Sequence, residues 1–295
     1  MKVSIVIPWF NTDWLVDKNI PAVVKAMENS KNSVIEIIIV DDGSTDKSNL
    51  FIKTKYPKIR LIKHKSNKGF SAAVNTGVRS AKGDLICLLN SDVVPSPNFL
   101  INVIKHFGDP KTFAVSLNEA GVFGWAKGYF KDGFIGHEPG GKSTTAHDTF
   151  WVSGGSGVFR RSTWIDLGGM DEKLLSPFYW EDLDLCYRAL KRGYRLLWEP
   201  SAVVEHQHET TISKLSKDYV SRIKERNQLL VIWKDVTSQR LFGKHISGLA
   251  KRLISHPGYI RIVFMAIVKI GPLIKARNKE IKEAKVSDEI IFSRF

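Results

Sequence analysis

Residues 35–46 read IEIIIVDDGSTD, an almost unbroken apolar run that ends in two aspartates and a short polar segment. A run rich in β-branched residues, such as Ile35–Val40, is typical of a strand that is buried on both faces of a parallel sheet. A second such run, Val3–Ile7, ends at Pro8, and residues 14–29 carry an apolar face at helical spacing. Strand, helix and strand at this spacing form a βαβ unit. The sequence therefore predicts an α/β fold with a doubly wound, mostly parallel sheet flanked by helices.

Ligands of such sheets bind beyond the carboxyl ends of the strands. The loops Pro8–Asn11 and Asp41–Ser44 are expected to meet at this edge, which we call the rim. A third predicted strand, Asp84–Leu89, delivers the segment Asn90–Asp92 to the same rim. A carboxylate there, near bound phosphates, is a natural ligand for a hard divalent cation, whereas a single aspartate after a strand is more often a turn residue.

The rim loops argue against two common classes of nucleotide-binding protein. No glycine fingerprint follows the first strand, as it would in a dinucleotide-binding dehydrogenase, and the chain has no P-loop. The acidic loop can instead accept hydrogen bonds from a base or a ribose. Helix capping explains Ser44 or Asp46, but it explains the tandem Asp41-Asp42 poorly because adjacent like charges are costly without a partner. A helix over Ser71–Ser80 is placed so that its N-terminus faces an anion.

Residues 178–188 read FYWEDLDLCYR and combine an acidic pair with a helical pattern. Glu181 and Asp182 directly follow three aromatic residues, and apolar residues then recur at helical spacing. The pair is therefore expected on the first turn of a helix, where the helix dipole favours carboxylates. Taken alone, the segment is a helix start with a solvated Asp184–Arg188 pair at i, i+4.

Glycine and histidine mark the region after the predicted sheet core. Glycines are dense from Gly121 to Gly157, as in loops that approach a ligand closely. A short strand over Ala202–Val204 is expected, and His206 and His208 lie just beyond it. A His-x-His pair can bind a metal, although it is more often incidental.

The positive charge of the chain is concentrated near its C-terminal end. The net charge is +14, and residues 209–295 hold 18 Lys and Arg against 8 Asp and Glu, so that this region alone carries +10. It has helical periodicity and should attract an anionic partner. Its apolar run Ile262–Ile274 is shorter than the roughly 20 residues that span a bilayer. The run suits a helix on a membrane surface and a packed core helix equally well.

Cysteine usage and the N-terminal sequence favour a cytoplasmic protein. Cys87 and Cys186 both lie within apolar runs, as buried thiols do in a reducing compartment. The apolar run after Lys2 ends at Pro8, so we expect no signal peptide. The 295 residues, 43% of them hydrophobic, are sufficient for a large core.

Eight segments, taken in order, resemble those of the inverting family-2 glycosyltransferases, which have the GT-A fold. They are VSIVIPWFN (3–11), IIIVDDGSTD (37–46), NKGFSAAVNTG (67–77), GDLICLLNSD (83–92), SGGSGVFRR (153–161), LGGMDE (167–172), YWEDLDLCYRALKRGY (179–194) and the strand ending in EHQH (205–208). Each segment alone is a weak signal, but eight in the family's order form a strong one. The match covers roughly residues 3–208.

The resemblance implies transfer of a sugar from a nucleotide-sugar donor, UDP- or dTDP-linked, to an acceptor hydroxyl with inversion at the anomeric carbon. Asp182 matches the position of the family's general base, and Glu181 stands beside it. The residues implied to bind the donor are Pro8, Phe10, Asn11, Asp41, Asp42, Lys68, Gly69, Asn75, Asn90, Ser91 and Asp92. Those implied to bind the acceptor are Gly154, Gly155, Tyr179 and Trp180.

The resemblance also implies a cofactor, Mn²⁺ or Mg²⁺. The segment Asn90–Asp92 stands where the family has its Asp-x-Asp metal motif, with Asn in the first place. This variant resembles the subgroup that attaches rhamnose and similar sugars to surface polysaccharides. Asp92 must then make the motif's metal contact, and His206 matches the position of a histidine ligand in some members. His208 is the less favoured of the two histidines.

The implied organisation is a GT-A catalytic domain over residues 1–212, followed by a helical basic region over residues 213–295. The catalytic domain divides into a nucleotide-binding half (1–117) and an acceptor half (118–212). We expect a glycan or lipid-linked acceptor and a peripheral location on the inner face of the cytoplasmic membrane, reached through the basic region. We expect no nucleic-acid partner, and the oligomeric state stays open.

Two other functions compete with glycosyl transfer. A nucleic-acid-binding protein would fit the net charge, but the excess charge is confined to the tail and no nucleic-acid motif occurs. A relative that binds a sugar nucleotide without catalysis would keep the fold. The joint presence of Asp92, Asp182 and His206 argues against that alternative.

Overall fold

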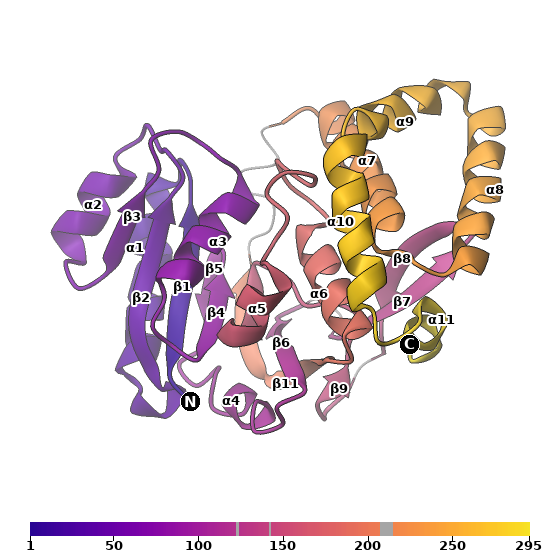
Figure 1. The fold of residues 1–295 in the computed structure, drawn as a ribbon. Coiled ribbons are helices and arrows are strands. Elements are labelled where there is room, and N and C mark those ends of the chain that lie inside the picture. The colour runs from indigo at the N-terminus through magenta and orange to yellow at the C-terminus, as the bar shows by residue number, and fades with distance from the viewer. Residues whose placement is uncertain (122–123, 142, 207–214) are drawn as a thin grey trace.

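The centre of the protein is a nine-stranded sheet, seen in a computed structural model that describes residues 1–121, 124–141, 143–206 and 215–295 (Figure 1). The strand order is β3-β2-β1-β4-β10-β6-β11-β5, with β9 beside β11 and with β7 and β8 in a separate hairpin. The strands are β1 Val3–Trp9, β2 Val34–Asp41, β3 Arg60–Lys63, β4 Leu85–Leu89, β5 Val93–Pro95, β6 Thr112–Glu119, β7 Ala126–Lys131, β8 Phe134–Pro139, β9 His147–Asp148, β10 Ser156–Arg160 and β11 Arg195–His206.

Helices cover both faces of this sheet. The helices are η1 Asp13–Leu15, α1 Val16–Glu28, η2 Ser30–Asn32, α2 Ser48–Lys55, α3 Phe70–Ser80, α4 Val103–His106, α5 Arg161–Leu167, α6 Glu181–Lys191, α7 Lys217–Asp235, α8 Gln239–Ser255, η4 Pro257–Tyr259, α9 Ile260–Ile267, α10 Ile270–Glu283 and α11 Asp288–Ser293. The helices predicted over residues 14–29 and Ser71–Ser80 correspond to η1 with α1 and to α3. The helix predicted to begin at the Glu181-Asp182 pair is α6.

The half of the sheet formed by β3, β2, β1 and β4 is parallel, as the sequence predicts. β1 pairs with β2 up to Trp9↔Asp41, so that the two strands end side by side at the rim. In the other half, β10 runs antiparallel between β4 and β6, while β6 and β11 are parallel to each other. Among the described strands of this sheet, β5, β9 and β10 therefore run against the other six. The prediction of a mostly parallel α/β fold is confirmed.

Alternate side chains of the central strands enter two separate cores, one on each face of the sheet. Ile5 and Ile37 pack with Ile20 of α1 in one core. Val6 packs with Val74 of α3 in the other, which also contains α6. Because successive residues of a strand point to opposite faces, a strand covered by helices on both sides must be apolar along its whole length. This explains the unbroken apolar runs in the sequence.

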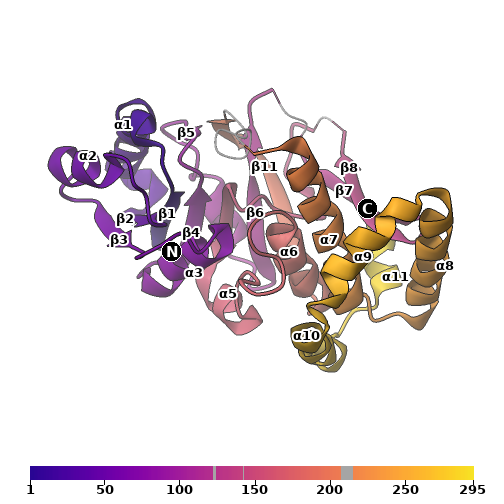
Figure 2. The same cartoon turned by 90° about the horizontal axis from the view of Figure 1, so that it is seen from above.

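The C-terminal helices pack on the same core as α6. Leu229 of α7, Val263 of α9, Leu273 of α10 and Ile291 of α11 are all buried there. Figure 2 shows α8, α9 and α10 at the end of the molecule opposite α1 and α2. One face of the run Ile262–Ile274 is thus a packed core face, although the same run also has an exposed face. The predicted boundary at residue 212 lies outside the described residues.

Among the residues described, no single helix has the length and apolar character needed to cross a bilayer. The pair Pro257–Ile267 and Ile270–Glu283, bent by 74°, meets that criterion jointly by length and composition.

The predicted short strand Ala202–Val204 is part of the 12-residue strand β11. The pairing of β11 with β6 shifts register between Trp198 and Val203, around Pro200. Proline cannot donate a ladder hydrogen bond, so the sequence pattern of one long strand is interrupted. Only the last part of this strand could therefore be predicted from the sequence.

Candidate active site

The loops after β1 and β2 are tied together at the rim. The Asp42 N–H donates to the Trp9 carbonyl at 2.8 Å. The Asn11 N–H donates to Ser44 Oγ at 3.0 Å, and the Thr45 N–H donates to Asn11 Oδ1 at 2.9 Å. Asn11 adopts a positive φ of 51°, a conformation that asparagine tolerates better than most residues. The structure thus brings together the two loops that the sequence places on one edge.

Asp41 is fully buried and holds the turn that follows β2. Its carboxylate accepts the Ser44 N–H at 2.9 Å and the Asn49 Nδ2 at 2.6 Å. Pro8 near the end of β1 and Phe10 just after it, which were predicted to line the donor pocket with Asp41, are partly exposed. These contacts stabilise the acidic loop before any ligand binds.

Asp42 organises a second loop, the one that leads into α3. Its carboxylate accepts the backbone N–H groups of Lys68 and Gly69 at 2.8–3.0 Å, and its Oδ1 lies 2.6 Å from His64 Nδ1. Gly69 has a φ of +91°, which favours glycine. Hydrogen bonds within the two loops therefore account for the tandem aspartates, which helix capping alone explains poorly. The Lys68 side chain is exposed.

Asn75, which was predicted to bind the donor, makes its hydrogen bonds within the protein. Its Nδ2 donates to the Met170 carbonyl and to Glu172 Oε1, both at 2.8 Å. Its Oδ1 accepts from Trp164 Nε1 and from the Met170 N–H, both at 3.1 Å. With its side chain buried and engaged in this way, Asn75 joins α3 to the 164–172 segment, and its role in donor binding stays a prediction.

The segment after β4 meets the glycine loop that was predicted to bind the acceptor. The Asn90 N–H donates to the Gly155 carbonyl at 2.8 Å, and a Cβ on Gly155 would lie 2.4 Å from Asn90 Nδ2. The Ser91 carbonyl accepts from Asn19 Nδ2 of α1 at 2.7 Å. Asp92 is 4% exposed. The predicted donor and acceptor segments are therefore in direct contact, and glycine is required where they touch.

His206 lies between two carboxylates at the end of β11. Its Nε2 is 3.2 Å from Asp92 Oδ1, and its Nδ1 is 3.1 Å from Glu119 Oε1. Burial opposes protonation of this histidine, but the hydrogen bonds and charges of Asp92 and Glu119 outweigh it and raise the pKa of His206 to about 9. Ser156 Oγ donates to Glu119 as well. The predicted pairing of Asp92 with His206 is present in the structure.

Sequence reasoning missed Glu119. It is the last residue of β6, which runs parallel to β11, so both strands end at the same edge. An acidic residue two positions after the mostly apolar run of residues 113–117 was the available signal. The pairing of β6 with β11 was needed to interpret it.

Asp92 and His206 fit a divalent cation whose remaining ligands come from a substrate. Within the described part of the chain, no group of three or more His, Cys, Asp or Glu side chains forms a metal-binding cluster. Mg²⁺ commonly takes one or two carboxylates together with substrate phosphates, and imidazole is a ligand for transition metals. A carboxylate on the other imidazole nitrogen, as Glu119 provides here, is the usual partner of a metal-binding histidine. His208 lies outside the described residues.

Glu181 and Asp182 open helix α6 with different surroundings. Asp182 Oδ2 accepts the Gly154 N–H at 3.3 Å, and its Oδ1 accepts the Leu183 N–H at 2.7 Å. Glu181 is 6% exposed, and its Oε2 has no hydrogen-bond partner among the described residues. Burial raises the pKa of Asp182 to about 6 against these hydrogen bonds, and burial together with the Asp182 charge raises the pKa of Glu181 to about 8. At neutral pH, Asp182 is therefore the ionised member of the pair.

The turn before this pair has an unusual backbone. Tyr179 and Trp180 have φ values of 70° and 76°, in the left-handed region that side chains other than glycine rarely adopt. Asn227 of α7 holds the turn, because its Nδ2 lies 2.6–3.0 Å from the carbonyl oxygens of Leu175, Phe178 and Tyr179. Strained backbone of this kind persists where the surroundings enforce it, commonly at functional sites. Asn227 was not predicted from the sequence.

The expectation of a solvated Asp184–Arg188 pair is wrong. The Asp184 side chain is fully buried, and Arg188 donates to it at 2.8 and 3.0 Å. Arg188 also donates to the carbonyls of Leu167 and Gly169 at 2.7 and 2.6 Å. Lys234 of α7 forms a further ion pair with Asp184. The pair is buried because α7 covers this face of α6.

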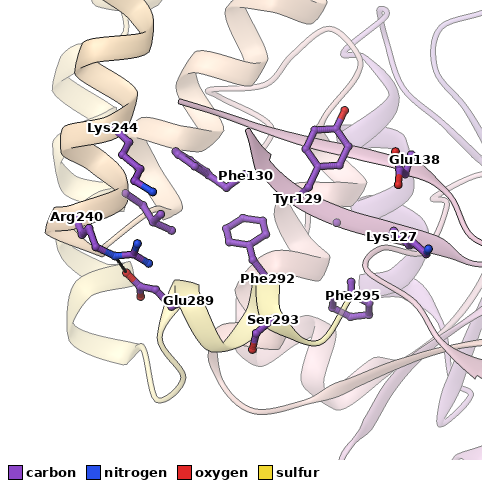
Figure 3. Close-up of a pocket in the computed structure, with 12 residues that line it drawn as sticks. Lys127, Tyr129, Phe130, Glu138, Arg240, Lys244, Glu289, Phe292, Ser293 and Phe295 are labelled. Carbon is purple, nitrogen blue, oxygen red and sulfur yellow. Dashed lines mark hydrogen bonds and ion pairs between the residues drawn. The ribbon is translucent and has the colours of Figure 1, made fainter. Parts of the chain in front are cut away.

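A groove of about 470 Å³ lies away from these residues, between the β7–β8 hairpin and the helices α8 and α11 (Figure 3). Tyr129, Phe130 and Phe292 contribute aromatic rings to it, and Arg240 pairs with Glu289 at its edge at 3.4 Å. It contains none of the predicted site residues.

The sheet order, the acidic rim and the carboxylates at the start of α6 together define a GT-A fold. A model of "Glycosyl transferase family 2" matches residues 4–165, and a model of "Glycosyl transferase family group 2" matches residues 85–268. The chain belongs to glycosyl transferase family 2.

Curated relatives agree with this family. The chain is 29% identical over 206 residues to a pre-mycofactocin glycosyltransferase of Mycobacterium tuberculosis, a match that covers 64% of this chain and 40% of the relative. It is 26% identical over 223 residues to a probable glycosyltransferase, YdaM, of Bacillus subtilis (71% and 51%). It is 29% identical over 178 residues to a poly-beta-1,6-N-acetyl-D-glucosamine synthase of Staphylococcus aureus (57% and 42%). The chain thus spans about half or less of the length of these relatives.

Solved structures share the fold at low sequence identity. GalNAc-T7 with UDP, GalNAc and Mn²⁺ superposes with a TM-score of 0.65 at 16% identity, covering 88% of this chain and 57% of the other. The Pyrobaculum calidifontis mannosyltransferase PcManGT with GDP-Man and Mn²⁺ gives 0.57 at 16% (95% and 84%). S. aureus TarS 1-349 with UDP-GlcNAc gives 0.56 at 16% (96% and 89%).

Proposed function

We propose that this chain transfers a sugar from a nucleotide-sugar to an acceptor hydroxyl with inversion at the anomeric carbon. The observation that carries the proposal is the meeting of two groups of side chains at one end of the sheet. Asp92 and His206 lie 3.2 Å apart on the donor side, and Asp182 is held 3.3 Å from the Gly154 N–H of the adjoining loop. The contact between Asn90 and Gly155 joins the two groups.

The donor is expected to bind along the rim formed by the loops after β1, β2 and β4. Pro8, Phe10, Asp41 and Asp42 are proposed to surround the nucleoside, with the exposed Lys68 side chain near the phosphates. We propose a UDP- or dTDP-linked donor. Two of the similar structures hold UDP or UDP-GlcNAc, and another holds GDP-Man, so all three nucleotides belong in an assay panel.

Asp92 and His206 are proposed to hold Mn²⁺ or Mg²⁺. When bound, such a cation neutralises the negative charge that develops on the departing nucleoside diphosphate. Asp92 contributes an anionic oxygen, and Glu119 orients the imidazole so that Nε2 faces Asp92. Two of the similar structures contain Mn²⁺.

Asp182 is proposed to act as the general base. Its carboxylate takes the proton of the acceptor hydroxyl as the acceptor oxygen bonds to the anomeric carbon and the bond from that carbon to the phosphate oxygen breaks. A pKa of about 6 keeps Asp182 ionised at neutral pH and also makes it a better proton acceptor than an ordinary aspartate. Glu181, whose pKa is about 8, keeps its proton beside it and adds no second negative charge.

The acceptor is proposed to be a surface-polysaccharide or lipid-linked glycan. Gly154 and Gly155 allow close backbone approach, and Tyr179 and Trp180 offer partly exposed aromatic faces to a sugar ring. We propose a deoxyhexose such as rhamnose as the donor sugar because Asn90 occupies the first position of the Asp-x-Asp motif. One similar protein is a poly-beta-1,6-N-acetyl-D-glucosamine synthase, so a hexosamine belongs in the panel too.

The test is hydrolysis of a panel of nucleotide-sugars by the full chain, with and without Mn²⁺. We expect one donor to be turned over in the presence of the cation, with Asp182→Asn losing turnover while the donor still binds. Asp92→Ala should instead weaken metal-dependent donor binding. Normal turnover by Asp182→Asn would refute the assignment of the base, and donor binding by Asp92→Ala with unchanged metal dependence would refute the ligand role.

A further inference from the structure

Five apolar side chains are exposed together where α8, η4 and α9 meet. Ile254 is 80% exposed, Ile260 50%, Phe264 66%, Ile267 45% and Val268 76%. We call these five residues the α9 ridge. Single exposed apolar residues are normal on a protein surface, but a contiguous group of large ones marks a site of interaction.

Four of the five ridge residues, all except Ile254 of α8, form the outer face of an amphipathic helix. From Ile260, its members recur at i+4, i+7 and i+8, so they share one side of α9. The opposite side carries Ile262, Val263 and Ala266, which are buried in the core shared with α7. The inner face fixes α9 on the protein, and the ridge is therefore held outward.

The stretch of chain that contains the ridge is strongly basic. Residues 236–279 contain nine Lys and Arg and no Asp or Glu. Lys251, Arg261 and Lys275 in this stretch are exposed. Exposed apolar side chains beside basic ones are complementary to a surface that accepts apolar groups between anionic ones. A bilayer with anionic headgroups is such a surface.

Helix α9 lies along the same upper edge of the molecule in Figure 1 as the rim, on the side opposite α1 and α2. In Figure 1, β1 starts near the N-terminus at the lower edge and runs upward, so the parallel strands end toward the top at the left of the view, while α9 lies at the top on the right. Lys269, just after α9, donates from Nζ to the Lys173 carbonyl at 2.6 Å. Lys173 lies in the segment that leads to Glu181 and Asp182. The ridge is thus attached to the loop that carries the active-site turn.

We propose that the α9 ridge docks on an anionic lipid bilayer and so turns the rim toward the membrane surface. Docking itself does not depend on the proposed glycosyl transfer. If the chain is a glycosyltransferase as proposed, docking further implies that it binds a lipid-linked acceptor at the cytoplasmic face of the membrane. This implication rests on the proposed function.

The experiment measures binding of the full chain to sedimented vesicles without donor or acceptor. One set of vesicles contains phosphatidylcholine alone, and in the other about one lipid in three is phosphatidylglycerol. The ridge variant is Phe264→Ser with Val268→Ser, and the charge variant is Arg261→Gln with Lys275→Gln. The matched control is Leu50→Ser on α2, because Leu50 is 62% exposed at the opposite end of the molecule.

We expect the unmodified chain and the control to bind the anionic vesicles and to bind neutral vesicles much less. The ridge variant should lose about tenfold or more of its partitioning, from the lost apolar burial. The charge variant should lose about 25-fold, from about fivefold per cation. Circular dichroism of each variant verifies that the fold is intact.

Three outcomes would overturn the proposal. They are no binding to anionic vesicles, equal binding to both vesicle types, and unchanged binding by the ridge variant. If the ridge variant instead converts a dimer to a monomer without altering vesicle binding, the ridge is a self-association surface and the proposal is wrong. Since no nucleotide-sugar is present, failure of the glycosyltransferase proposal leaves these results unaffected, and the reverse also holds.

Discussion

The titration of Asp182 gives a quantitative test of the proposed base. Its carboxyl is largely enclosed by protein, and burial raises its pKa from 3.8 to about 6. With that value, about one side chain in eleven is ionised at pH 5, against about ten in eleven at pH 7. An aspartate with the ordinary pKa of 3.8 would be more than about nine-tenths ionised at both values. If the ionised form is the active one, the rate must fall about tenfold from pH 7 to pH 5.

The assay is kcat for donor hydrolysis, measured with saturating donor and Mn²⁺ so that changes in their binding drop out. The residual rate of Asp182→Asn should be independent of pH over this range. Asp166→Asn, which removes an exposed carboxylate outside the site, should retain the full acid limb. A kcat that stays constant from pH 7 to pH 5 would refute the assignment of Asp182 as the base. The same fall in kcat toward pH 5 in Asp182→Asn as in the unmodified protein would refute it too.

Substitutions at three further residues test how the site is positioned. Glu119→Ala should lower the Mn²⁺ affinity about 10- to 100-fold in titration calorimetry. Glu119→Gln can still accept a hydrogen bond and should recover part of this affinity. Equal affinity in the unmodified protein and both variants would contradict the orienting role of Glu119. Asn227→Ala removes the hydrogen bonds that its side chain donates to three carbonyls, and it should lower the free energy of unfolding by about 2–4 kcal/mol and lower kcat as well. Full kcat would show that the turn keeps its shape without them. Lys234→Met breaks a buried ion pair with Asp184 and should lower the free energy of unfolding in urea by about 3 kcal/mol. A decrease below about 1 kcal/mol would indicate that the pair is dispensable for stability.

The parallel half of the fold could be predicted because its signals are local. β1, β2 and β4 are apolar runs that end in polar loops, and the rim follows from the rule for parallel strands. The antiparallel insertion of β10 could not be predicted in the same way. Its sequence, SGVFR, follows a glycine-rich loop, and its place between β4 and β6 is decided by packing of segments far apart in the chain.

The site was predicted best where each side chain follows a strand or starts a helix. Asp92, Asp182 and His206 all lie at such positions. Asp184 was wrongly predicted to be solvated because its partner, Lys234 of α7, comes from a remote part of the sequence. The partners of Asn75 in the 164–172 segment are equally remote and could not be predicted either. A helical pattern shows which residues are polar, but it does not show whether another helix later covers them.

The hydrogen bonds from Asn227 to the turn before Glu181 have a consequence for recombination between relatives. A family model matches residues 4–165, and a chimera made by exchanging that region alone would combine a rim from one protein with a turn shaped by another. The turn takes its geometry from α7, which ends at Asp235. A functional exchange therefore needs its crossover beyond Asp235, so that the active-site turn and the helix that fixes it are inherited as one piece.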